Sequence, residues 1–447
     1  MKHFFGDDLL LNNPSSQMIY NHIKTLPIVD YHCHLDPEII YKNPYINDIG
    51  ELWMAGDHYK WRAMRLNGID EKYITGDASY KEKFLKYASI MPSLAGNPLY
   101  YWSHLELKNI FDINMPLNKD TAELIYEKAN KKAKTLRIRD LFKLFKVEYV
   151  TTTDDPTSEL IYHGKYENTY VIPTFRADPI LNINDEYIAK LSKVSNVEIN
   201  SLDDLLIAIN NRLDFFVNKG CVIADQSFEF FPSIYPSIEE ARNIFNRRNN
   251  WNDLDKESFL GFILVYLAKE YKKRNMTMQL HFAVTRNVNK LAFKKCGVDS
   301  GFDITSTQAN IKNIIMFLNQ FLEGEQPDTI LYSLNDSNLT EIACLTGAFK
   351  NLRIGAAWWF NDTVLGIKRN LQTIAEYSSL GNNLGMLTDS RSFASYVRFD
   401  LFRRILASYI GELVENGEYD ISAALNLAQN ISYGNAKKMI SKELTIK

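Results

Sequence analysis

Several features that would indicate particular classes of protein are scarce in this chain of 447 residues. No apolar run approaches the roughly 20 residues that a membrane-spanning helix needs, and the longest, residues 261–268, is far shorter. The formal net charge of −3 gives no electrostatic case for binding nucleic acid or an anionic membrane. We therefore expect neither nucleic acid nor a membrane as a partner.

Cysteine is also scarce. The chain has four cysteines, which lie far apart and form no CxxC pair, so we expect reduced thiols rather than a disulfide framework. Near the N-terminus, Asp7 and Asp8 stand where a signal peptide would need its apolar stretch. These observations predict a cytoplasmic protein.

Flexible linkers, low-complexity tracts and internal repeats are absent from the sequence. The hydrophobic share of 46% and the charged share of 23% are those of an ordinary globular protein. The chain is too long for one small core, so it forms either one large α/β barrel with an insertion or two to three domains. The sequence does not say whether copies of the chain associate, although a homo-oligomer agrees with everything in it.

Short apolar runs alternate with amphipathic helical patterns from about residue 146 onward. With a first strand near residue 28, they predict eight strands, nearly all followed by helices, as in a (β/α)8 TIM-type barrel. A doubly wound sheet would normally carry a Gly-rich first turn, which is missing here. The expected later strands are 147–153, 170–175, 221–224, 276–281, 329–334, 352–357 and 384–388.

Between the first and second expected strands lies a long, mostly helical section. One of its helices is expected to begin at Asp120, with Glu123 completing a capping box. We therefore divide the chain into an N-terminal segment with the first strand (1–37), a helical insertion (38–145) and the remainder of the barrel (146–447).

The first expected strand ends in His32-Cys-His34. Positions i and i+2 of an extended chain point to the same face, so both imidazoles can reach one point beyond the strand. Two neutral imidazoles suit a zinc-like cation if a third ligand joins them. The alternative is a pair of strand-end histidines that bond to nearby backbone.

Active sites of such barrels lie at the carboxyl ends of the strands. Strands one and eight are neighbours in a closed barrel, so Asp389 is expected beside His32 and His34, which favours the metal site. For Asp154, Asp155 and Asp225, capping and turn roles are at least as plausible as catalysis. The polar and aromatic residues at the expected strand ends are His32, His34, Asp154, Asp155, Arg176, Asp225, His281, Asn335, Asp336, Trp358, Trp359, Asp389 and Arg391.

A His-x-His on the first strand, a histidine on the fifth and an aspartate on the eighth resemble the amidohydrolase superfamily. More narrowly, the chain resembles the uronate isomerase (glucuronate isomerase) family. The motif Gly56-Asp-His-Tyr-Lys-Trp-Arg-Ala-Met-Arg65 is specific to that family and not to its hydrolase relatives. The matching stretches, which cover nearly the whole chain, are 30–34, 56–65, 101–107, 153–156, 175–176, 279–281, 357–362 and 385–393.

The resemblance implies a barrel of the metal-dependent hydrolase kind and an aldose–ketose isomerisation of a small-molecule hexuronate. The substrates would be D-glucuronate, giving D-fructuronate, and D-galacturonate, giving D-tagaturonate. It also implies one divalent ion, with zinc expected and no organic cofactor. The residues that match the family's site are the metal ligands His32, His34 and Asp389, with His281 nearby as a further candidate ligand, the dyad His58 and Tyr59, and the substrate-contacting Arg176 and Arg391.

The expected chemistry agrees with these assignments. Tyr59 can remove the C2 proton, assisted by His58, if neighbouring cations (Lys60, Arg62 and Arg65 in sequence) lower its pKa. Asp389 can accept the hydroxyl proton during ring opening, and an arginine can hold the uronate carboxylate through two hydrogen bonds. The aromatic pair Trp358 and Trp359 can wall the pocket, although ordinary packing is as good an explanation for one of them.

Three positions depart from the family pattern: Gln226, Asp336 and Phe399. They leave the substrate preference open. A one-metal hydrolase or deaminase of the same superfamily is the main rival, whereas a two-metal hydrolase is disfavoured because 221–228 contains no bridging lysine. A barrel that only binds a ligand is the second rival, but such a protein is expected to have lost ligands that this chain keeps.

Overall fold

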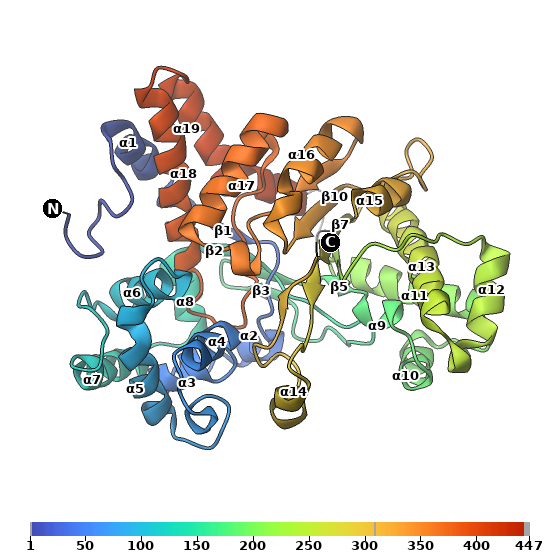
Figure 1. The fold of residues 1–447 in the computed structure, drawn as a ribbon, viewed down its shortest axis with the longest axis horizontal. Coiled ribbons are helices and arrows are strands. Elements are labelled where there is room, and N and C mark those ends of the chain that lie inside the picture. The colour runs from blue at the N-terminus through green and yellow to red at the C-terminus, as the bar shows by residue number, and fades with distance from the viewer. Residues whose placement is uncertain (1, 308–309, 442–447) are drawn as a thin grey trace.

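Short parallel strands occupy the centre of the computed structural model, and helices surround them (Figure 1). The structure describes residues 2–307 and 310–441. One sheet has the order β1-β2-β4-β3, in which only β3 is antiparallel, and the second has the all-parallel order β11-β10-β7-β6-β5. Their strands are β1 Ile28–Asp30, β2 Val147–Thr151, β3 Gly164–Tyr166, β4 Thr169–Ile172, β5 Phe175–Arg176, β6 Ile223–Ser227, β7 Thr277–Phe282, β10 Thr329–Ser333 and β11 Leu352–Ile354. The predicted α/β class with parallel strands is confirmed.

The two sheets share one stretch of chain, because β4 and β5 are separated only by Pro173 and Thr174. Proline has no N–H to donate, which explains why the expected strand 170–175 is split at this point. Pairing nevertheless continues across the break: the Asp154 N–H donates to the Thr174 carbonyl (3.0 Å), and the Arg176 N–H donates to the Asp154 carbonyl (3.0 Å).

The expected eighth strand, 384–388, is not a regular strand. Gly385 has a φ of +74°, and the Thr388 N–H donates to the Asp30 carboxylate (2.9 Å) instead of a backbone carbonyl. The segment still lies beside the end of β1, as the sequence predicts. The Asp389 N–H donates to the His32 carbonyl (3.1 Å), and the His34 N–H donates to the Ser390 carbonyl (3.0 Å).

The helices of the second half form as their apolar stripes predict. In α11 the Ser201 hydroxyl caps the first turn, and the apolar residues of one stripe are all buried: Leu202, Leu205, Leu206, Ile209, Leu213 and Phe216. In α17 the stripe residues Ile367, Leu371 and Ile374 are buried, and Val364 is half-buried. The helices from residue 178 onward are α9 Asp178–Leu181, α10 Asp185–Ser195, α11 Leu202–Asn218, α12 Ile238–Asn246, α13 Asp253–Lys273, α14 Lys290–Cys296, α15 Ile311–Leu318, α16 Leu339–Ala348, α17 Val364–Tyr377, α18 Val397–Glu415, α19 Ile421–Gln429 and α20 Asn435–Ile440.

The section between β1 and β2 is helical, as predicted, and gathers on one side of the strands (Figure 1). It shares a hydrophobic core with α1 and α18, so it packs onto both ends of the chain. The predicted helix start at Asp120 is wrong: α7 begins at Ala122, and the Asp120 N–H donates to the Asn118 side chain in a preceding turn. The helices before β2 are α1 Pro14–Ile23, α2 Pro37–Lys42, α3 Ile49–Met54, α4 His58–Leu66, α5 Tyr80–Ile90, α6 Pro98–Phe111, α7 Ala122–Ala133 and α8 Ile138–Phe145.

One excursion of the chain was not predicted. After β7, residues 283–306 form the two-stranded sheet of β8 (Val284–Thr285) and β9 (Ile304–Thr305), with α14 between them. Strands of two residues are too short to show a periodic pattern, so the sequence gives no signal for them. In Figure 1 this excursion extends away from the central strands on the side where α4 lies.

Two negative expectations can be compared with the structure. All four cysteines, Cys33, Cys221, Cys296 and Cys344, are free, as expected. Within the residues that the structure describes, no helix has both the length and the apolar character needed to cross a membrane.

The structure predicts a pH-dependent contribution to stability from His104 on α6. Its Nε2 accepts the Leu117 N–H (3.0 Å), so the ring proton is on Nδ1, which donates to the Tyr100 carbonyl (2.7 Å). Burial lowers the pKa of His104 from 6.5 to about 4. The unfolded chain therefore binds the additional proton more readily, and stability present above pH 6.5 is lost as the pH falls toward 4.

Urea denaturation from pH 7.5 to 4 tests this prediction. Between pH 6.5 and 4, wild type should lose up to about 3 kcal/mol of unfolding free energy relative to His104→Gln. The control His22→Gln removes an exposed imidazole from α1 and should keep the wild-type slope. Parallel curves for wild type and His104→Gln would contradict the assignment.

Candidate active site

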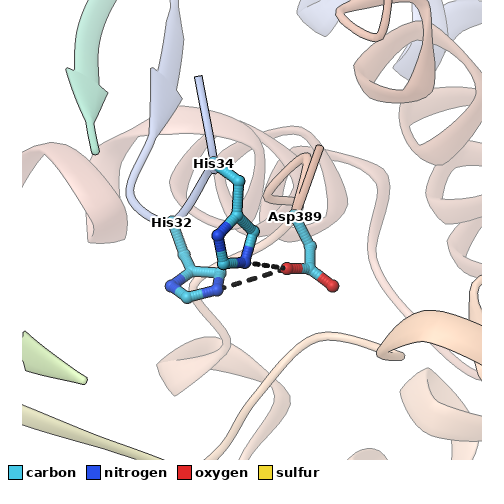
Figure 2. Close-up of side chains that lie close together, drawn as sticks. All are labelled: His32, His34 and Asp389. Carbon is cyan, nitrogen blue, oxygen red and sulfur yellow. Dashed lines mark ion pairs between the residues drawn. The ribbon is translucent and has the colours of Figure 1, made fainter. Parts of the chain in front are cut away.

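Two imidazole nitrogens converge on one carboxylate oxygen at the end of β1 (Figure 2). His32 Nε2 lies 3.3 Å and His34 Nε2 lies 3.2 Å from Asp389 Oδ1. His32 and His34 follow β1 in extended chain, so they reach the same point, while Asp389 arrives from the segment hydrogen-bonded beside it. The three residues that the sequence predicted as metal ligands are therefore brought together, with one candidate ligand atom each.

Neighbouring groups hold two of these side chains in orientation. His34 Nδ1 lies 2.8 Å from the Thr153 hydroxyl, and the second oxygen of Asp389 accepts a hydrogen bond from the Trp358 indole (2.8 Å). Asp389 itself adopts a φ of +44°, which is unusual for a residue with a side chain and is typical of constrained functional positions. The carboxylate is thus directed at the two histidines by both its backbone and Trp358.

His281 lies beside this cluster, as predicted. Its ring centroid is 4.8 Å from that of His32, and its Nδ1 lies 2.8 Å from Asp225 Oδ1. His32, Asp225 and His281 make a second buried group with metal-ligating atoms close together. His32 Nδ1 and His281 Nε2 are buried without any hydrogen-bond partner in the structure. Unpartnered nitrogens of this kind are uncommon in protein interiors and mark the place where a ligand is expected.

Opposing charges set the ionisation of the cluster. Burial raises the pKa of Asp389, but its bonds to His32 and His34 outweigh burial and hold that pKa well below its ordinary value. Burial also raises the pKa of Asp225, and the charges of His281, His32 and Arg176 overcome it and lower the pKa. Burial lowers the pKa of His34 to about 4. Both carboxylates are therefore anionic and His34 is neutral near pH 7, as metal ligation requires.

A cavity of about 770 Å³ opens above the cluster. Of the predicted site residues, the metal candidates, the dyad, both arginines and both tryptophans line it. They are His32, His34, His58, Tyr59, Arg176, His281, Trp358, Trp359, Asp389 and Arg391. The predicted site residues that come from the helical section are His58 and Tyr59, the first two residues of α4.

The two arginines are already paired. Arg176 contacts the Asp225 carboxylate (3.1 Å) and the Asp178 carboxylate (2.9 Å), whereas Arg391 contacts Asp299 (2.8 Å). Arg176 is thereby tied to the same aspartate that orients His281. Each guanidinium enters the cavity in an orientation fixed by a carboxylate.

The expectation that neighbouring cations lower the pKa of Tyr59 is wrong. Lys60 is buried against Asp57, while Arg62 and Arg65 contact the chain around residues 300–303. Burial and the charge of Asp389 raise the pKa of Tyr59 well above its ordinary value, and the Arg398 guanidinium, 5.5 Å from the centre of the Tyr59 ring, lowers it only in part. Burial also lowers the pKa of His58. In this structure the dyad consists of a neutral phenol and a neutral imidazole.

Sequence reasoning missed several charged residues that line the cavity, among them Asp178, Arg286, Asp299 and Asp303. Three of them lie on the excursion 283–306, which has no periodic signal. Asp178 is two residues beyond Arg176, and this i, i+2 spacing was the one available sign that the two could pair. The role left open for Asp225 is now clear, since its carboxylate bonds both His281 and Arg176.

The three departures from the family pattern do not line the cavity. Gln226 donates to the Tyr271 hydroxyl in the core, Asp336 pairs with Arg369 of α17, and Phe399 is buried in the core shared with the helical section. Their substitution therefore leaves the composition of the cavity wall unchanged.

Comparison with known proteins agrees with this geometry. The family model described as glucuronate isomerase matches residues 1–440. A uronate isomerase of Brachyspira hyodysenteriae is 41% identical over 463 residues (98% of this chain, 99% of that one), and one of Lachnospira eligens is 40% identical over 468 residues (99% and 100%). The crystal structure of uronate isomerase from Thermotoga maritima matches with a TM-score of 0.95 and 35% identity, covering 98% of this chain and 100% of that one. The chain therefore belongs to the uronate isomerase (glucuronate isomerase) family.

Proposed function

We propose that this enzyme interconverts aldose and ketose hexuronates, D-glucuronate with D-fructuronate and D-galacturonate with D-tagaturonate. The observation that carries the proposal is one cavity in which a His–His–Asp cluster, a His–Tyr dyad and two guanidinium groups face a common space. Such a set can bind a carboxylate, stabilise an oxyanion and move a proton, which are the three requirements of the reaction. A hydrolase or deaminase would leave the family-specific segment 56–65 without a purpose at the cavity wall.

The same proposal includes a closed (β/α)8 barrel with the helical section inserted after its first strand. The stretch 169–176 joins both sheets, and the segment before Asp389 lies against β1. Between β11 at one edge of the second sheet and β1 of the first sheet lies the segment that carries Asp389. The Trp358 side chain, which follows β11, donates a hydrogen bond to Asp389 in this segment. In that arrangement the cluster stands at the carboxyl ends of the strands, where barrel enzymes place their active sites.

The donor set fits one divalent ion, for which zinc is our choice. Ligand atoms about 2.0–2.1 Å from a tetrahedral zinc ion lie roughly 3.3 Å apart. The two measured separations to Asp389 Oδ1, 3.3 Å from His32 and 3.2 Å from His34, have this spacing. His281, whose Nε2 is buried and unpartnered, is the further candidate ligand. When bound, such an ion stabilises negative charge that develops on a sugar oxygen.

The uronate carboxylate is the group that Arg176 and Arg391 recognise in this proposal. A guanidinium matches a carboxylate with two parallel hydrogen bonds, and both arginines line the cavity. Arg176 already satisfies two carboxylates, so Arg391, with a single partner, has more donors left for substrate. Trp358 and Trp359 form the apolar wall that limits the size of the bound sugar.

Isomerisation moves one hydrogen from C2 to C1 through an enediolate, so C2 is oxidised while C1 is reduced. We assign the transfer to His58 and Tyr59, whose rings stack with centroids 4.7 Å apart. Since both are neutral, the imidazole can accept a proton and the phenol can donate one without either starting as an ion. Asp389, anionic near neutral pH, can accept the hydroxyl proton during ring opening.

Metal content tests the proposed ligands. His32→Ala and His34→Ala should each lose most of the bound zinc in elemental analysis of protein purified without chelator. His58→Ala is the matched control, because His58 lines the same cavity but supplies no atom to the cluster. Equal zinc content in wild type and in both ligand variants would refute the site.

Substrate range tests the function and the carboxylate clamp together. Proton NMR should show conversion of D-glucuronate or D-galacturonate, and no conversion of D-glucose, which lacks the carboxylate. Arg391→Met should raise KM for hexuronates by about tenfold to a hundredfold, because one or two charge-assisted hydrogen bonds are lost. Arg391→Lys, which keeps the charge, should lose less. Turnover of glucose equal to that of glucuronate would exclude the clamp.

Proton transfer tests the dyad. Tyr59→Phe should lower kcat by about 10²–10⁴-fold with little change in KM. In deuterated water wild type should place solvent deuterium on C1 of the ketose, because the phenol that donates there exchanges its proton with solvent. Tyr59→Phe should deliver deuterium to C1 more slowly by the same factor, while circular dichroism and zinc content remain those of wild type. If the variant still delivers a proton to C1 at a near wild-type rate, Tyr59 is not the donor and Asp389 takes that role.

A further inference from the structure

The two arginines that end the motif 56–65 bind a loop rather than the reaction centre. From α4, Arg62 Nη1 donates to the Asp303 carbonyl (3.1 Å), and Arg65 Nη1 donates to the Ser300 carbonyl. The Arg65 guanidinium also lies 4.2 Å from the centre of the Phe302 ring. We call residues 299–303 the clasp loop. It lies in the excursion 283–306, between α14 and β9.

The opposite side of the clasp loop holds two arginines of the cavity. Asp299 Oδ2 lies 2.8 Å from Arg391 Nη2, and Asp303 Oδ2 lies 3.0 Å from Arg286 Nη1. Asp303 also accepts the Asn287 N–H (2.7 Å), which closes the base of the excursion. The loop therefore carries the acidic partners of Arg391 and Arg286, and all four of these side chains line the cavity.

Close packing fixes how near the loop approaches α4. Gly301 has a φ of +87°, and a Cβ at this position would lie 2.9 Å from the His58 carbonyl oxygen. Only glycine combines that backbone conformation with that approach. The loop thus rests on the first residue of α4, next to Tyr59.

The ion pairs alone do not explain why the loop is ordered. The Asp299 and Arg391 side chains are 45% and 41% exposed, and exposed pairs contribute little because water screens them and both side chains lose freedom. Arg65, by contrast, is only 17% exposed and is itself held by two bonds to Glu71 (2.8 and 2.7 Å). In the contact between α4 and the clasp loop, the Arg65 side chain is therefore the partner that is held in place.

We propose that Arg62 and Arg65 are positioning residues that hold the clasp loop, and through Asp299 orient Arg391 for the substrate carboxylate. This inference rests on the proposed function for its substrate, but the loop contact itself does not. It gives the end of the family-specific motif a purpose: the helix that presents His58 and Tyr59 also fixes the loop that orients the carboxylate-binding group.

Trypsin and steady-state kinetics test the proposal on the full-length enzyme. The excursion contains Lys290, Lys294 and Lys295 on α14, which are exposed but helical, so release of the clasp loop should let α14 unfold locally and make these sites cleavable. Arg65→Met should be cut in α14 about tenfold faster than wild type. Its KM for D-glucuronate should rise about tenfold while kcat stays within about twofold, and its zinc content should not change.

Two further variants and one matched control separate the clasp from general damage. Glu71→Gln weakens the two bonds that hold Arg65 but leaves Ser300 and Phe302 in place, so its cleavage and KM should lie between those of wild type and those of Arg65→Met. Gly301→Ala should be cleaved faster, as Arg65→Met is. Gly324→Ala is the matched control, because Gly324 has a similar positive φ (+85°) but its Cβ would lie in open space outside the excursion, and this variant should not be cleaved faster.

The outcomes are distinct. Wild-type cleavage of Arg65→Met and Gly301→Ala would overturn the clasp. Faster cleavage with an unchanged KM would show that the loop is held but does not orient Arg391, which would overturn the positioning role. If wild type fails to isomerise any hexuronate, the proposed function fails, while the cleavage comparison still decides the loop contact.

Discussion

The site depends on one closure: the segment ending at Asp389 must lie beside the end of β1. Buried hydrogen bonds from Thr388 to Asp30 hold this closure, together with the backbone bonds of Asp389 to His32 and of His34 to Ser390. Because these groups are buried, separating the two segments would leave several of them unpaired, at a cost of about 1–3 kcal/mol each. The distances from Asp389 to the two imidazoles follow from this closure.

Charge in the cavity is organised before substrate arrives. Asp225 bonds both His281 and Arg176, Arg176 also bonds Asp178, and Arg391 bonds Asp299. Pairs formed in advance keep each guanidinium and imidazole in place, so less reorganisation is needed when an oxyanion develops. In the proposed function the same pairing favours a carboxylated substrate, because its carboxylate would replace Asp299 as the partner of Arg391.

Burial decides the charge state of His58 and Tyr59. His58 and Tyr59 stand at the start of a helix packed against the strand ends, where both charged forms are disfavoured. The sequence predicted a lowered pKa for Tyr59, because the basic residues Lys60, Arg62 and Arg65 follow it in the chain. Helix geometry directs those side chains elsewhere: Lys60 to Asp57, and the arginines to residues 300–303.

The sequence by itself determined the parallel α/β class, most of the strands and helices, and part of the cavity lining. Their signals are local: period-two and period-3.6 apolar patterns, and His32 and His34 on one side of an extended segment. The tertiary structure alone decided the split of the strand at Pro173, the side-chain bonding that replaces a regular eighth strand, and the excursion 283–306. It also decided which carboxylate each arginine meets. These features depend on contacts between segments far apart in the chain, and on two-residue strands that leave no periodic trace, so no local pattern can encode them.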